Sequence, residues 1–247
     1  MFSIEVSKIK NTALMWFLLI GSLLIPLAVA VSVFEEALKN INIHQEWGSG
    51  WYRVLRGSSF FTAPMIMVLI PSFVMDIEYR SSSWKYLLTL PVTRQSIFHS
   101  KLLICILGCL FFYLSSFLAY GIAMSVYWFY FPSSGLFDSE FPILQIAILS
   151  LRMIISSIAI MILHFGLSLF IKNLIYNIGI GVFGIVLGIL TFDWNMKFYF
   201  PHSSCLVSMF KSSAGTSAIT RYEIISIVLI IISYLSSFWF FRKKFRG

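Results

Sequence analysis

Residues 153–192 read MIISSIAIMILHFGLSLFIKNLIYNIGIGVFGIVLGILTF, and the only formal charge among them is at Lys172. A helix crosses the hydrocarbon core of a bilayer with about 20 apolar residues. The quoted stretch is long enough for two such helices, and Lys172 and Asn173 leave room only for a tight turn between them. The stretch therefore predicts a hairpin of two membrane spans, 153–171 and 174–192.

The rest of the chain repeats this pattern. Of its 247 residues, 59% are hydrophobic and 11% are charged, whereas a soluble domain has about 45–50% apolar and about 25% charged residues. This composition excludes a soluble enzyme, a disordered chain and a disulfide scaffold. We expect an all-α, polytopic membrane protein in which residues 1–247 form one transmembrane domain. Its six predicted spans are 13–34, 57–75, 102–128, 153–171, 174–192 and 224–241.

The distribution of charge predicts the orientation of these spans. With six spans both termini lie on one side of the membrane, and that side carries 11 of the 18 Lys and Arg residues but 3 of the 10 acidic ones. It therefore holds the whole formal net charge of +8. Lys and Arg are enriched in cytoplasmic loops, so both termini are predicted to be cytoplasmic. No nucleic-acid partner is needed to explain the basic charge.

The sequence lacks the motifs of common catalytic sites. It contains no G-x-x-x-x-G-K-[ST] loop, no H-E-x-x-H pair and no G-x-S-x-G turn. We therefore expect no catalytic residue, no metal and no cofactor bound by this chain. Cys105 and Cys109 share a helix face and are interpreted as a buried structural pair.

Two ionisable residues, one inside the fourth span and one at its outer end, are candidates for a cargo path. His164 lies inside the span, where ionisable side chains are often functional, although a hydrogen bond between helices is the simpler explanation for a single neutral histidine. Arg152 lies at its outer end, where we expect the side chain to reach the lipid headgroups rather than bind cargo.

The fifth span carries a stripe of small residues. Asn177, Gly181, Gly184 and Gly188 recur at intervals of three and four residues, and the last two form a G-x-x-x-G pattern. Such a stripe lets another helix approach closely. We expect the partner to be a helix of the same chain, with a dimer contact as the alternative. Residues 194–222 follow; they are too apolar for a solvated loop, and we expect them to form two helices that dip into the outer leaflet.

The loop between the second and third spans is the most informative segment. Residues 76–103 read DIEYRSSSWKYLLTLPVTRQSIFHSKLL. Serines precede a short amphipathic helix that begins at Trp84, and Pro91 ends it. Thr93 can then cap a second helix that continues into the third span. From the residues alone, the short helix could dock a soluble partner or lie on the lipid surface.

This loop resembles that of ABC-2 type permeases, the membrane subunits of ATP-binding cassette transporters. The resemblance rests on an acidic residue after the second span, on Leu87, Leu88, Pro91 and Arg94, and on the following S-K-L-L. The segment WKYLLTLPVTR is most similar to the lantibiotic-immunity branch of that family. Ser81 to Ser83 depart from the pattern, because many members carry a Gly-Thr pair there.

The resemblance implies a permease without its own ATPase, in the bacterial cytoplasmic membrane. ATP would be used by a separate ABC ATPase subunit, and a second copy or a related permease would complete the transport unit. The implied ATPase-docking residues are Glu78, Arg80, Trp84, Lys85, Leu87, Leu88, Pro91 and Arg94. The implied cargo is hydrophobic or amphipathic, and within the branch it is a lantibiotic-like peptide expelled to give immunity.

Three alternatives remain at this point. The chain could be a signalling or assembly protein that transports nothing, or an ABC-2 exporter of another cargo such as a lipid, drug or ion. An intramembrane enzyme would need a polar cluster at membrane depth, for which the sequence offers only His164.

Overall fold

The computed structural model of the chain describes residues 7–9, 12–39, 47–81, 93–134, 140–194, 199–210 and 221–244. The described residues are helical or irregular and include no strand, which confirms the predicted all-α class. The helices are α2 (Ala13–Leu38), α3 (Trp47–Phe60), α4 (Thr62–Arg80), α6 (Arg94–Tyr130), α7 (Ile143–Phe170), α8 (Leu174–Leu190), α9 (Ser204–Phe210) and α10 (Arg221–Lys244), with short turns η1 (Pro132–Ser134) and η3 (Pro201–Ser203).

Five of these helices, α2, α4, α6, α7 and α10, are long and apolar enough to cross a membrane. The sixth predicted span corresponds to α8, which is apolar but has 17 residues. At 1.5 Å per residue, α8 falls a little short of the roughly 30 Å hydrocarbon core. Among the described residues, the structure thus has five helices of spanning length and one shorter apolar helix where the sequence predicted six spans.

The second span differs from its predicted bounds. The sequence placed a continuous helix from residue 57, but the helix breaks at Phe61, and residues 47–60 form the separate helix α3. One face of α3 is buried in the bundle through Trp51, Val54 and Leu55. This helix was missed because Arg53 and Arg56 interrupt the apolar run on its other face.

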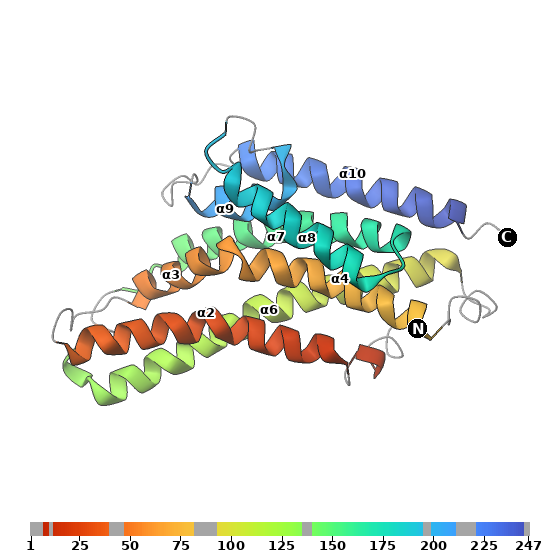
Figure 1. The fold of residues 1–247 in the computed structure, drawn as a ribbon. Coiled ribbons are helices and arrows are strands. Elements are labelled where there is room, and N and C mark those ends of the chain that lie inside the picture. The colour runs from red at the N-terminus through yellow and green to blue at the C-terminus, as the bar shows by residue number, and fades with distance from the viewer. Residues whose placement is uncertain are drawn as a thin grey trace.

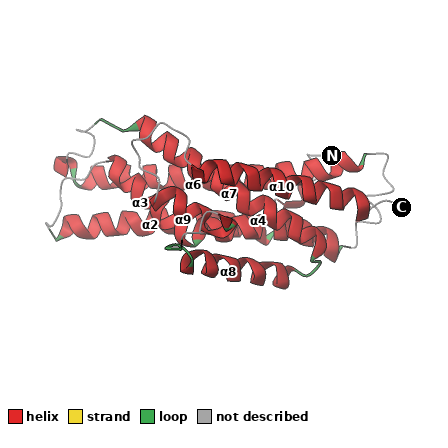
Figure 2. Cartoon of the chain, turned by 90° about the horizontal axis from the view of Figure 1, so that it is seen from above, coloured by secondary structure: helices red, strands yellow, loops and turns green. Residues whose placement is uncertain are grey.

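The long helices run roughly side by side (Figure 1). Helix α2 packs along α6, whereas α4 and α10 both pack against α7. Helix α8 lies at the side of the bundle (Figure 2). The first turn of α2, the last turn of α10, the end of α4 and the start of α6 all lie at one end of the bundle, which we call the terminal end (Figure 1). Which side of the membrane this end faces stays a prediction.

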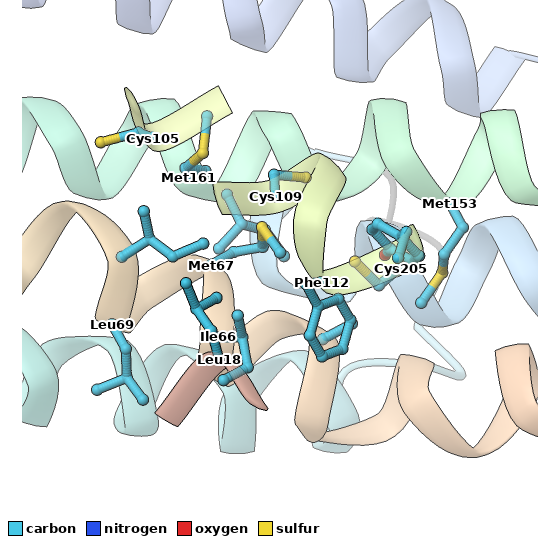
Figure 3. Close-up of a cluster of buried hydrophobic side chains, with 14 of the residues drawn as sticks. Leu18, Ile66, Met67, Leu69, Cys105, Cys109, Phe112, Met153, Met161 and Cys205 are labelled. Atoms are coloured by element: carbon cyan, nitrogen blue, oxygen red, sulfur yellow. The ribbon is translucent and has the colours of Figure 1, made fainter. Parts of the chain in front are cut away.

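The core is rich in sulfur and aliphatic side chains contributed by five helices. Figure 3 shows Leu18 of α2, Met67 of α4, Cys109 of α6, Met161 of α7 and Cys205 of α9 within one cluster. All of them are less than 4% exposed. Buried methionine and cysteine fill such irregular spaces without a polar group that needs a partner.

The outer faces of the bundle are apolar as well. Large side chains such as Ile20 and Leu24 of α2, Leu114 of α6 and Ile231 and Trp239 of α10 are exposed. A soluble protein rarely shows so much contiguous apolar surface, whereas lipid chains solvate it well. The apolar exterior therefore agrees with a body that is surrounded by the bilayer.

Candidate coupling site and buried polar clusters

A buried cluster of three charges lies at the terminal end of the bundle. Glu78, in the last turn of α4, accepts a hydrogen bond from Lys101 Nζ of α6 at 2.8 Å and one from Lys8 Nζ at 2.7 Å. Both bonds reach the same oxygen, Oε1. The side chains of Glu78 and Lys101 are each 1% exposed and that of Lys8 is 29% exposed. Buried charges persist in proteins when they are paired in this way.

This cluster corrects the expected position of Glu78. The sequence placed Glu78 on a surface that docks a partner, but its side chain points into the bundle and is occupied by the two lysines. Its carboxylate therefore holds helices together rather than touching a docked protein. The signal missed was Lys101, which belongs to the S-K-L-L motif but whose side chain is buried in the first turns of α6.

Other predicted docking residues are exposed or lie outside the description. Arg80 is exposed and pairs with Asp76 within α4 at 2.6 Å, and Arg94 begins α6 on the surface. The predicted N-cap of this helix is confirmed, because the Thr93 side chain accepts a hydrogen bond from Ser96 N at 3.3 Å. Five predicted docking residues lie outside the described residues: Trp84, Lys85, Leu87, Leu88 and Pro91.

The small-residue stripe of α8 faces two other elements of the same chain. Asn177 Nδ2 donates to Ser72 Oγ of α4 at 2.7 Å, and a Cβ at Gly181 would clash with a methyl group of Val68. Nearer the C-terminal end of α8, a Cβ added at Gly184 would lie 2.6 Å from the His202 ring. A Cβ added at Gly188 would lie 2.9 Å from the His202 backbone. Small residues here let α4 and η3 approach the axis of α8.

His164 has a partner that sequence reasoning missed. Its Nε2 lies 2.9 Å from Nε2 of His202 in η3, and both side chains are buried. One nitrogen must donate and the other must accept, which two neutral rings can do. The pair therefore joins the segment that contains η3 to α7.

The segment predicted to dip into the outer leaflet is embedded in the bundle. Within residues 199–210, the short helix α9 packs against α3, α7 and α10. Ser204 Oγ donates to the Ser156 carbonyl of α7 at 3.2 Å, and Cys205 lies 3.5 Å from Ser157 Oγ. The structure describes one helix where the sequence predicted two. The remaining residues of the predicted pair lie outside the described part of the chain.

Arg152 does not extend to the lipid headgroups. Its side chain is 6% exposed, and its Nε lies 3.4 Å from Glu223 Oε1 of α10, which is 5% exposed. The snorkelling expectation was therefore wrong, because α10 supplies a buried carboxylate that no local pattern connects to Arg152. The ion pair links α7 to the start of α10.

The structure brings the candidate cargo-path residues into separate clusters. Arg152 pairs with α10 and His164 pairs with η3, so each is occupied by a contact between elements. Among the described residues, no group of three or more His, Cys, Asp or Glu side chains is arranged to hold a metal ion. Each of the two residues therefore connects α7 to another element of the bundle.

Fold and charge placement together define a multi-pass, α-helical membrane protein. The model of one family, described as ABC-2 family transporter protein, matches residues 1–188. The match covers more than half of the chain, so the chain belongs to the ABC-2 family of transporters. It includes the 76–103 loop, the lysine–glutamate cluster and nearly all of α8. No curated protein and no solved structure gives a significant match.

Proposed function

We propose that this chain is the permease subunit of an ABC exporter, driven by ATP that a separate subunit hydrolyses. Membership of the ABC-2 family, over residues 1–188, is the observation that carries this proposal. The family implies an ABC ATPase partner, and the sequence has no phosphate-binding loop of its own. We therefore expect ATP to be hydrolysed by another protein.

The segment 82–92 is the proposed docking element. It connects the end of α4 to the start of α6, and both lie at the terminal end of the bundle. Trp84, Leu87 and Leu88 share an apolar face in its sequence, and Arg80 and Arg94 flank it with exposed cations. In this proposal, the apolar face docks in a groove of the ATPase. When the ATPase dimer closes, the movement of the groove would displace α4 and α6.

The proposed cargo is a hydrophobic or amphipathic peptide of the lantibiotic kind. The support is the similarity of WKYLLTLPVTR to the immunity branch, and the apolar exterior and core suit a cargo that leaves from the membrane. A second permease, identical or related, would complete the transport unit in the bacterial cytoplasmic membrane. Expulsion of the peptide would protect the cell that makes it.

Affinity purification tests the assignment. A tagged chain is purified from membranes of its own host, and co-purifying proteins are identified by mass spectrometry. We expect an ABC ATPase with the wild type and its loss with Trp84→Ala combined with Arg94→Ala. The matched control is Trp194→Ala, because Trp194 is exposed and remote from the loop in sequence. A signalling or assembly role would be indicated by a non-ATPase partner and unchanged resistance to the peptide nisin.

A further inference from the structure

We propose that Glu78 is a positioning residue for energy coupling. Its buried carboxylate holds α4, α6 and the segment around Lys8 as one unit, so that a displacement of residues 82–92 moves all three together. The coupling role rests on the proposed function, whereas the rigid unit is a property of this chain alone.

The geometry of the cluster supports a single fixed arrangement. One oxygen, Glu78 Oε1, accepts from Lys101 at 2.8 Å and from Lys8 at 2.7 Å. The two lysines come from segments 93 residues apart in the chain, since one precedes α2 and the other lies in α6. Charge-assisted hydrogen bonds of this length are directional and strong. A carboxylate bound on two sides at once leaves little freedom to any of the three segments.

The position of the cluster relates it to the loop. Glu78 lies within one helical turn of the end of α4 at Arg80, and Lys101 lies two turns into α6, which begins at Arg94. The cluster therefore joins the two helices close to the ends that this segment connects in the chain. A force applied to 82–92 reaches both helices at the point where they are tied together.

The buried location argues for a positional role. Replacing a buried ion pair by apolar side chains of similar size is often neutral or stabilising, so a buried pair is weak evidence for stability as such. The two hydrogen bonds to one oxygen of Glu78, however, form only at one relative placement of the three segments, and the proposal rests on that geometry. A cluster that is dispensable for folding and required for fixed placement is expected to matter when force is transmitted.

A second ion pair in α4 provides a matched control. Arg80 Nε lies 2.6 Å from Asp76 Oδ2, but Arg80 is 73% exposed and both residues belong to the same helix. This pair has the same charges and lies in the same two turns, yet it joins no separate elements. Its removal should leave the placement of α4 relative to α6 unchanged.

The first test needs no partner protein. Spin labels are attached to Ser81→Cys and Gln95→Cys, both exposed positions at the two ends of the loop, in the full chain in lipid nanodiscs. Double electron–electron resonance is expected to give a narrow distribution of the distance between the two labels. It is expected to broaden in Glu78→Met combined with Lys101→Met, while Asp76→Ala stays narrow. A double variant as narrow as the wild type would overturn the proposal, and helical content by circular dichroism shows that this variant is folded.

The second test uses the complex with its co-purified ATPase. In the wild type, trapping with ATP and vanadate is expected to leave the distance between positions 81 and 95 unchanged, because both ends move together. In the Met–Met variant, ATPase binding and ATP hydrolysis are expected to persist while trapping changes that distance. An unchanged distance in this variant would contradict the coupling role. If the wild type brings down no ATPase, the proposed function fails, and the first test still decides whether Glu78 fixes the unit.

Discussion

The imidazoles of His164 and His202 face each other with their Nε2 atoms 2.9 Å apart, although 38 residues separate them in the chain. The contact joins α7 to η3 at a point where Gly184 and Gly188 of α8 also lie close to His202. The segment that contains η3 and α9 is thereby part of the packed bundle rather than a surface loop.

The contact between His164 and His202 is expected to contribute to the stability of the bundle. His202→Ala removes one partner and leaves Nε2 of the fully buried His164 without this hydrogen bond. Leaving a buried polar group without its hydrogen bond costs about 1–3 kcal/mol. Thermal unfolding in detergent measures the loss. A melting temperature of His202→Ala equal to that of the wild type would contradict the pairing.

Gly188→Ala is expected to destabilise the bundle. A Cβ there would lie 2.9 Å from the backbone carbonyl group of His202, which cannot move aside as a flexible side chain would. Overpacking of this kind costs about 1–3 kcal/mol. Gly179→Ala, in the same helix with nothing within 4 Å, is the control and should be neutral or slightly stabilising. Equal melting temperatures for the two variants would show that α8 does not pack as described.

We expect a strong coupling energy between Arg152 and Glu223 in the free energy of unfolding. Arg152→Met or Glu223→Gln alone leaves a buried charge without its partner and should cost about 3–5 kcal/mol. The double variant should cost much less than the sum. The exposed Lys39–Glu35 pair, at 3.6 Å, is the control and should couple by less than about 1 kcal/mol. Additive effects at Arg152 and Glu223 in a double-mutant cycle of unfolding would rule out the pair.

Bilayer thickness made much of the fold predictable from sequence. A helix that crosses hydrocarbon must be apolar for about 20 residues, so the spans beginning at 13 and 174 agree with the starts of α2 and α8. Capping is equally local, which is why Thr93 could be identified. The helix α3 was missed because it lies among charged residues and is buried on one face only.

The partners of the polar residues could not be predicted. Lys101 belongs to the S-K-L-L motif, but nothing in the sequence indicates that its side chain points inward to Glu78, where it meets Lys8. Glu223 lies 71 residues from its partner Arg152, and His202 lies 38 residues from its partner His164. Each pairing depends on how two segments are aligned along one another. That alignment is set by tertiary packing and cannot be deduced from the spacing of residues within either segment. The predicted docking residues 84–91 stay a prediction.

Site-specific photocrosslinking tests the permease assignment most directly. A benzoylphenylalanine replaces Trp84 in one protein and Trp194 in another, both expressed in the native host and irradiated in intact cells. The account predicts that position 84 forms a covalent adduct with an ABC ATPase and that position 194 does not. Adducts with lipid or with a non-ATPase protein at position 84, or an ATPase adduct at position 194, would contradict it.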